Sequence, residues 1–186
     1  MQSFMEANGM QNGLLFTADP YSKVMDPNDK KTATLFGDGA AVTWLGTNPC
    51  FRSGRFLFGS DGNKNESIIV RDNGRLEMNG RAVFTFSVRV VPKNIRDMLE
   101  INQLTVKQID LFLLHQGSLH IVNSIADALG VSRELCPFHS SEYGNTVSSS
   151  IPMLIHREFN NTNMNIAVIS GFGVGLSWAS TVLFRL

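Results

Sequence analysis

The chain has 186 residues, 43% of them hydrophobic, and its 16 Lys and Arg residues balance its 16 Asp and Glu residues. This composition is typical of a globular protein, and the neutral balance excludes the strong electrostatic field that attracts nucleic acid or an anionic membrane surface. The sequence has no secretory-signal pattern, no disulfide framework and no apolar run of the about 20 residues that span a bilayer, which predicts a cytoplasmic protein without membrane partners.

The first quarter of the chain predicts one helix end and two strands. A helix is expected to stop at Asn8-Gly9, and a first strand covers residues 14–18 before Asp19-Pro20 ends it. A second strand is expected over residues 40–45.

The composition turns polar and rich in Gly and Asn from residue 47 onward. Residues 67–70 and 75–77 flank an Asp-Asn-Gly sequence, which is typical of a hairpin turn. We expect residues 47–78 to form an insertion across the surface. The longest helical pattern follows over residues 80–103, where Pro92 is expected to kink the helix or divide it in two.

Four apolar residues at 111–114 predict a buried strand of a parallel sheet, and His115 follows them directly. Ligands bind at the carboxyl edge of such sheets, so the imidazole lies where chemistry is done. Ser118 is predicted to cap the next helix, which ends at Gly130. A histidine at a strand end is by itself more often structural, so position alone assigns no role.

The last forty residues predict a helix over 147–155, a buried strand over 166–169, a glycine-rich turn over 171–175 and a closing strand with Trp178. This pair of strands echoes the pair in the first quarter, whose second strand contains Trp44. The echo predicts two duplicated halves. The C-terminal copy is complete, whereas only the last piece of the N-terminal copy is present.

Six short motifs occur in order along nearly the whole chain. They are Leu35-Phe36-Gly37-Asp38-Gly39-Ala40, Met78-Asn79-Gly80-Arg81-Ala82-Val83-Phe84, Leu114-His115-Gln116, Tyr143-Gly144-Asn145-Thr146, Ser150-Ile151-Pro152 and Gly171-Phe172-Gly173-Val174-Gly175-Leu176-Ser177-Trp178. Each motif alone is weak, but together and in this order they resemble β-ketoacyl-acyl carrier protein synthase III, a family of thiolase-like condensing enzymes.

The resemblance implies an α/β, thiolase-like fold with αβαβα layers, built from two duplicated halves. Residues 1–46 are then a remnant of the N-terminal half, residues 47–78 the surface insertion with its hairpin, and residues 79–186 the C-terminal half. We therefore expect the chain to be the C-terminal portion of such an enzyme. It is expected to form a homodimer or to pair with the N-terminal half.

The activity implied by the resemblance is a decarboxylative Claisen condensation in fatty acid or related polyketide synthesis. A cysteine accepts the acyl group of acyl-CoA, which is then joined to malonyl-acyl carrier protein, and neither a cofactor nor a metal takes part. That cysteine belongs to the N-terminal half, at the start of a buried helix that favours its thiolate. Cys50 lies in an expected loop and Cys136 in an expected strand, so neither replaces it, and the 186 residues alone are expected to be inactive.

The resemblance also carries over the residues of the decarboxylation site. His115 and Asn145 match the pair that donates hydrogen bonds to the thioester carbonyl, where they stabilise the enolate left by loss of CO2. Phe172 matches a phenyl ring beside the reacting carboxylate, and Gly173 matches a close backbone approach beside the cysteine. The other expected pocket residues are Gln116 and Ser118.

The sequence departs from the family pattern at one motif, and two alternative functions stay open. The sequence Gly117-Ser118-Leu119-His120 stands where the family usually continues Ala-Asn-x-Arg, which predicts altered contacts with the phosphopantetheine arm or the carrier protein. The chain is alternatively a non-catalytic, thiolase-like partner subunit or interaction module, or a half-domain that only binds CoA. The site residues are also compatible with purely structural roles. Asn145 after Gly144, for example, would equally cap a helix or shape a turn.

Overall fold

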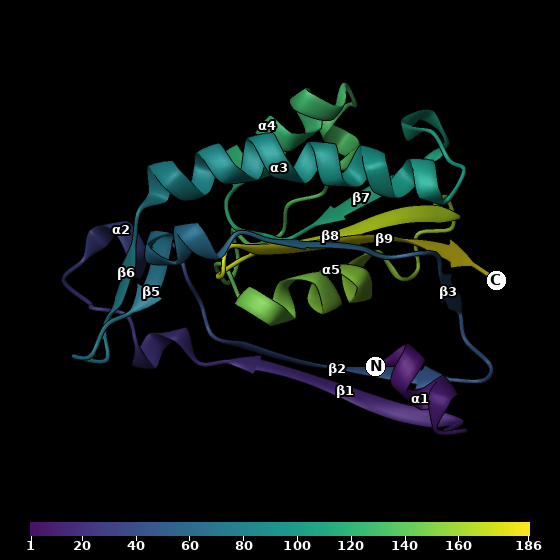
Figure 1. The fold of residues 1–186 in the computed structure, drawn as a ribbon, viewed down its shortest axis with the longest axis horizontal. Helices are drawn as coiled ribbons and strands as arrows, with labels where there is room; N and C mark the ends of the chain where they lie inside the picture. The colour runs from purple at the N-terminus through teal and green to yellow at the C-terminus, as the bar shows by residue number, and fades with distance from the viewer.

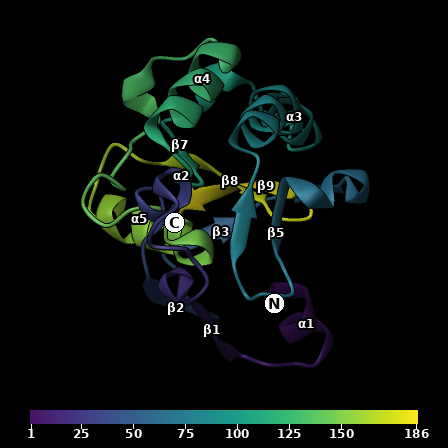
Figure 2. The ribbon, with the colours of Figure 1, turned by 90° about the vertical axis from the view of Figure 1, so that its left-hand side faces the viewer.

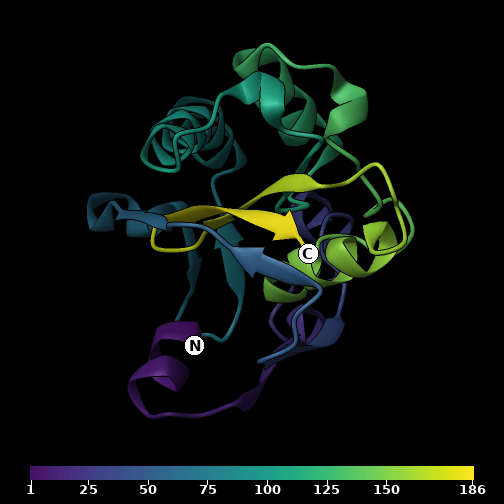
Figure 3. The same ribbon diagram turned by 90° about the vertical axis from the view of Figure 1, so that its right-hand side faces the viewer.

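The computed structural model describes residues 1–186, and its elements stack in layers (Figure 1). The helices α3 (Gly80–Ile101) and α4 (Leu119–Leu129) cover one face of a five-stranded sheet, and α5 (Ser150–Glu158) covers the other. Beyond α5 lies a ribbon of β1 (Asn12–Asp19) and β2 (Gly39–Gly46). Figures 2 and 3 show this order, α, β, α, β, from the two sides of the molecule.

The five-stranded sheet is mixed. Its strand β8 (Ile166–Gly173) pairs in parallel with β7 (Leu111–Leu114) and antiparallel with β9 (Ser177–Arg185). The other edge of β9 pairs antiparallel with β3 (Phe51–Ser53) and β4 (Leu57–Ser60). Helices cover both faces of β7, and accordingly all four of its residues are apolar and buried.

The structure corrects the expected surface insertion over residues 47–78. Its first part is not an excursion, because β3 and β4 extend the main sheet along β9. Its second part does contain the expected hairpin, in which β5 (Ile68–Val70) pairs with β6 (Leu76–Met78). The division of the chain at residues 46 and 78 otherwise stays a prediction.

Short helices and single turns connect these elements. They are α1 (Gln2–Ala7), η1 (Tyr21–Lys23), α2 (Lys30–Ala33), η2 (Gly62–Ser67), η3 (Val106–Gln108), η4 (Arg133–Leu135) and η5 (Val147–Ser149). The expected helix end at Asn8 is confirmed, because α1 stops there. Cys136 follows η4 and lies outside every strand, so its expected place in a strand is wrong.

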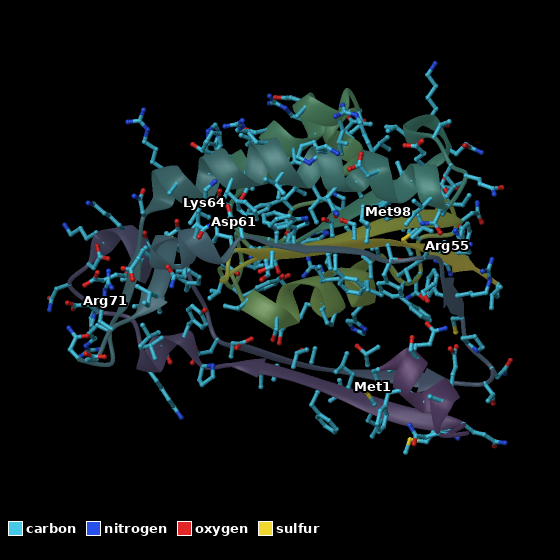
Figure 4. The ribbon with its side chains drawn as sticks, in the orientation of Figure 1. Met1, Arg55, Asp61, Lys64, Arg71 and Met98 are labelled. Carbon is cyan, nitrogen blue, oxygen red and sulfur yellow. The ribbon has the colours of Figure 1, made fainter.

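Helix α3 runs from Gly80 to Ile101 without a break, so the expected division at Pro92 is wrong. Asn79 caps its first turn by accepting a hydrogen bond from the Ala82 N–H over 3.0 Å. Val91 and Ile95, on either side of the proline, are fully buried. Packing on both sides therefore holds the helix together although Pro92 donates no hydrogen bond. The side chains between α3 and the sheet, Met98 among them, fill this layer in Figure 4.

Side chains of β7 alternate between the two faces of the sheet. Phe112 and Leu114 belong to the main core, which α3 and α4 cover, whereas Leu111 and Leu113 pack with Leu154 of α5. The same alternation turns the next side chain, that of His115, toward the α5 face. No helix in the structure combines the length and apolar character needed to cross a membrane.

Candidate functional site

A cavity of about 780 Å³ opens where β7 and β8 end and where α4 and α5 begin. His115, Asn145 and Phe172 all line it, so three groups that are far apart in the sequence meet in one place. Ser118 and Gly173 line it as well. This is the carboxyl edge of the parallel pair of strands, where ligands of open α/β sheets bind.

His115 is fixed on several sides. Its backbone N–H donates to the Ser170 carbonyl over 2.9 Å, and its ring meets the Phe172 ring edge to face with centroids 5.4 Å apart. Its Nδ1 lies 2.7 Å from the Ser150 hydroxyl, at the start of α5. Burial lowers the pKa of this imidazole to about 4, against a weaker opposing effect of the Val147 carbonyl, so the ring is neutral at pH 7.

Asn145 is held by an unexpected neighbour, the segment at residues 35–37. Its N–H donates to the Leu35 carbonyl over 2.8 Å, and its own carbonyl accepts from the Gly37 N–H over 3.0 Å. Its side-chain Oδ1 accepts from the Val147 N–H over 2.9 Å, which confirms the turn-shaping role. Because Oδ1 is engaged, the side-chain amide NH2, which has no hydrogen-bond partner in the chain, is the part left for a ligand.

Glycine is required where these two segments cross. Gly144 has a φ of +79°, and a Cβ there would lie 2.9 Å from the backbone N of Gly37. A Cβ on Gly37 would lie only 1.8 Å from the Tyr143 carbonyl oxygen. Two motifs that the sequence presents separately are thus one structural unit, and this unit positions the Asn145 carboxamide.

The glycine-rich segment near the C-terminus differs from the expectation. Gly171, Phe172 and Gly173 belong to β8, and the turn comes only after them, so the expected turn over residues 171–175 is too early. A Cβ at Gly173 would meet nothing within 4 Å, and no residue of this chain therefore requires a glycine there. The approach expected beside a cysteine stays a prediction.

Gln116 and Ser118 have different outcomes. Gln116 is buried and does not line the cavity; its amide donates to the carbonyls of Leu114 and Pro137, and its Oε1 accepts from the His139 N–H. Its amide therefore braces the end of β7, and its expected place in the pocket is wrong. Ser118 caps α4 as expected, accepting from the Ile121 N–H over 3.2 Å, and also faces the cavity.

Other residues line the cavity although the sequence does not predict it. Phe84 of α3 and His120 of α4 stack in parallel with ring centroids 4.7 Å apart, and both line the cavity. The sequence shows both residues only as members of short motifs and gives neither a role in the site. The only signal for them is that His120 falls where the family usually has arginine. Ser150, which also lines the cavity, stands in a motif of the sequence that predicts no role for it.

Neither cysteine lines this cavity. Cys50 is exposed, whereas Cys136 is buried, which raises the pKa of its thiol to about 12. Such a thiol is almost entirely protonated at neutral pH and is a poor nucleophile. The structure contains no cluster of three or more His, Cys, Asp or Glu side chains that could hold a metal ion.

Comparison with known proteins gives consistent matches. The family model described as 3-oxoacyl-[acyl-carrier-protein] synthase III C terminal matches residues 99–184, and the model of 3-oxoacyl-[acyl-carrier-protein] synthase III matches residues 1–62. The chain is 34% identical to the β-ketoacyl-[acyl-carrier-protein] synthase III of Lactococcus lactis subsp. cremoris strain MG1363 over 98% of its own length and 62% of that protein. The chain thus spans about three fifths of the length of this relative.

Solved structures agree. The Thermus thermophilus β-ketoacyl-[acyl carrier protein] synthase III is 32% identical, with a TM-score of 0.90 over 100% of this chain and 62% of that one. The priming β-ketosynthase of the R1128 polyketide biosynthetic pathway is 29% identical, with a TM-score of 0.84 over 97% of this chain and 59% of that one. The fold is accordingly thiolase-like, and the chain belongs to the 3-oxoacyl-[acyl-carrier-protein] synthase III family.

Proposed function

We propose that these residues supply the decarboxylation site of a synthase that condenses an acyl thioester with malonyl-acyl carrier protein in fatty acid or related polyketide synthesis. The observation that carries the proposal is the meeting of the His115 imidazole, the Asn145 carboxamide and the Phe172 ring on one cavity. The substrates are acyl-CoA and malonyl-acyl carrier protein, and no cofactor is needed.

The chemistry follows from what these groups offer. Loss of CO2 from the malonyl thioester leaves the electron pair of the broken C–C bond as an enolate, with negative charge on the thioester oxygen. A neutral His115 and the amide of Asn145 donate N–H groups toward that oxygen and stabilise the charge as it develops. Phe172 presents an apolar ring to the carboxylate, which favours its departure as uncharged CO2. The enolate carbon then attacks the carbonyl carbon of the acyl thioester and forms the new C–C bond. The C–S bond of that thioester breaks, and its sulfur leaves as a thiolate.

The acyl group is proposed to be held by a cysteine other than Cys50 and Cys136. Neither thiol lies on the cavity, and burial keeps Cys136 protonated. The 186 residues alone are then unable to form the acyl-enzyme. Their activity depends on the remaining part of the synthase, contributed by the N-terminal half or by a partner.

A second candidate is a non-catalytic partner subunit of a heteromeric condensing enzyme. The observation that favours it is the β1–β2 ribbon, which exposes Phe16 and Trp44 to solvent by 69% and 68%. An exposed apolar surface of this kind is typical of a protein–protein interface, and a partner subunit could bury it. The two candidates differ in whether His115 and Asn145 take part in chemistry.

The test measures CO2 release from malonyl-acyl carrier protein by the complete gene product that contains this chain. His115→Ala and Asn145→Ala are each expected to slow it by about 10²- to 10³-fold, the effect of losing one such donor. His156→Ala is the control, because His156 lies on α5 but outside the cavity. Unchanged CO2 release in both cavity variants would leave the subunit role as the better proposal.

A further inference from the structure

Ser150 is buried at the first position of α5, and its hydroxyl is within hydrogen-bond distance of His115 Nδ1, at 2.7 Å. We propose that Ser150 is a positioning residue that decides which ring nitrogen of His115 carries the proton. This inference rests on the proposed function, because it concerns the same imidazole. It names a group, 35 positions away in sequence, that makes this histidine a donor toward the cavity.

A neutral imidazole has one N–H and one lone pair, and the partner of one nitrogen fixes the state of the other. Two polar groups act on His115: the Ser150 hydroxyl at Nδ1, and the Val147 carbonyl, which lies 2.9 Å from that hydroxyl. The carbonyl only accepts, so by itself it keeps the proton on Nδ1. The hydroxyl also donates, and when it donates to Nδ1 the ring proton resides on Nε2.

The proton of the Ser150 hydroxyl has a competing acceptor, the Val147 carbonyl, at 2.9 Å. That carbonyl already accepts the backbone N–H of Ser150, so it stays satisfied when the hydroxyl turns away from it. Nδ1 has no other donor in the chain and lies nearer, at 2.7 Å. The hydroxyl is therefore assigned as the donor to Nδ1.

The assignment determines what the cavity offers to a substrate. Nε2 of His115 has no hydrogen-bond partner in the chain, and the ring lines the cavity. With Ser150 in place, Nε2–H is available to donate to a thioester oxygen bound in the cavity that Asn145 also lines. Without the hydroxyl, the Val147 carbonyl draws the proton to Nδ1, and a lone pair on Nε2 repels that oxygen.

The experiment is long-range ¹H–¹⁵N correlation NMR of the 186-residue chain labelled at histidine, which reports the protonated nitrogen of each ring. The chain has four histidines, and a His115→Gln variant assigns the signal. We expect Nε2–H in the unmodified chain, mostly Nδ1–H in Ser150→Ala, and a return to Nε2–H in Ser150→Thr, which restores a hydroxyl. Ser149→Ala is the control, since this buried neighbour contacts Thr17 and the Gly39 carbonyl instead of the imidazole.

An Nδ1–H tautomer in the unmodified chain, or the same tautomer with and without the hydroxyl, overturns the proposal whether or not the enzyme decarboxylates anything. In the complete gene product, Ser150→Ala is expected to lower kcat for CO2 release by at least about tenfold with little change in KM. A shift of tautomer without a change in CO2 release supports the role of Ser150 and instead refutes the proposed role of His115 as a donor.

Discussion

The buried environment of His115 opposes the charged form of its imidazole. Burial lowers its pKa to about 4, whereas the unfolded chain protonates near the ordinary value of 6.5. As the pH falls between these values, the unfolded state takes up a proton that the folded state refuses. The folded state therefore loses stability, by up to about 3 kcal/mol once the pH is below 4.

This loss is measurable by urea unfolding between pH 7 and pH 4.5. The free energy of unfolding is expected to fall less steeply in His115→Gln than in the unmodified chain, because glutamine does not titrate. All other ionisable groups are common to the two proteins and cancel in the difference. Parallel curves would show that His115 titrates normally in the folded state.

For single residues, the sequence predicts which residue ends a strand or starts a helix, but it does not predict which side chains that residue contacts. His115 can be identified because an apolar run stops directly before it, and Ser118 because a helical pattern starts after it. The role of Gln116 cannot be predicted, since its partners Pro137 and His139 are more than 20 positions away. Ser150 is hidden for the same reason, because nothing local indicates that its hydroxyl meets an imidazole.

At the scale of elements, the close approach of Gly37 and Gly144 holds the Asn145 backbone in place. A substitution at Gly144 tests how much this close approach contributes to stability. Gly144→Ala places a Cβ at positive φ and 2.9 Å from the backbone of Gly37, so both strain and a clash oppose it. We expect the free energy of unfolding to fall by more than about 3 kcal/mol, beyond the about 1–2 kcal/mol of left-handed strain alone.

The matched control is Gly130→Ala. Gly130 has nearly the same φ, +75°, but a Cβ there meets nothing within 4 Å, so only the strain remains. Urea unfolding of the two variants separates the clash from the strain. Equal losses in the two variants would mean that the crossing segments move apart easily.

Elements with strong periodicity or clear turns are predictable, and short edge strands are not. The sequence indicates α3, α4 and the β5–β6 hairpin because each has its own local signal. It misplaces β3 and β4, which have three and four residues and pair with β9 more than 110 positions later. It also overrates Pro92, because burial on both sides of this residue outweighs one lost hydrogen bond.

For the whole molecule, the exposed ribbon predicts association. Phe16 and Trp44 are about two-thirds exposed, and Leu14 and Val42 add to the same apolar surface. Light scattering at rising concentration is expected to show dimers or larger species of the 186-residue chain. Phe16→Ser together with Trp44→Ser should shift them to monomers, whereas Val70→Ser, an exposed change on the hairpin, should not. A chain that stays monomeric throughout contradicts this expectation.

The backbone pairing of residues 35–37 with Asn145 also limits how synthases of this kind can be recombined. The two regions matched by separate family models are joined by backbone hydrogen bonds at Asn145, so they cannot be exchanged independently of each other. In a chimera that takes its first 62 residues from one parent and the remainder from another, residues 35–37 and Asn145 come from different parents. The position of the Asn145 carboxamide then depends on a backbone segment with which it did not evolve. Crossover points are best chosen so that both glycine segments come from a single parent.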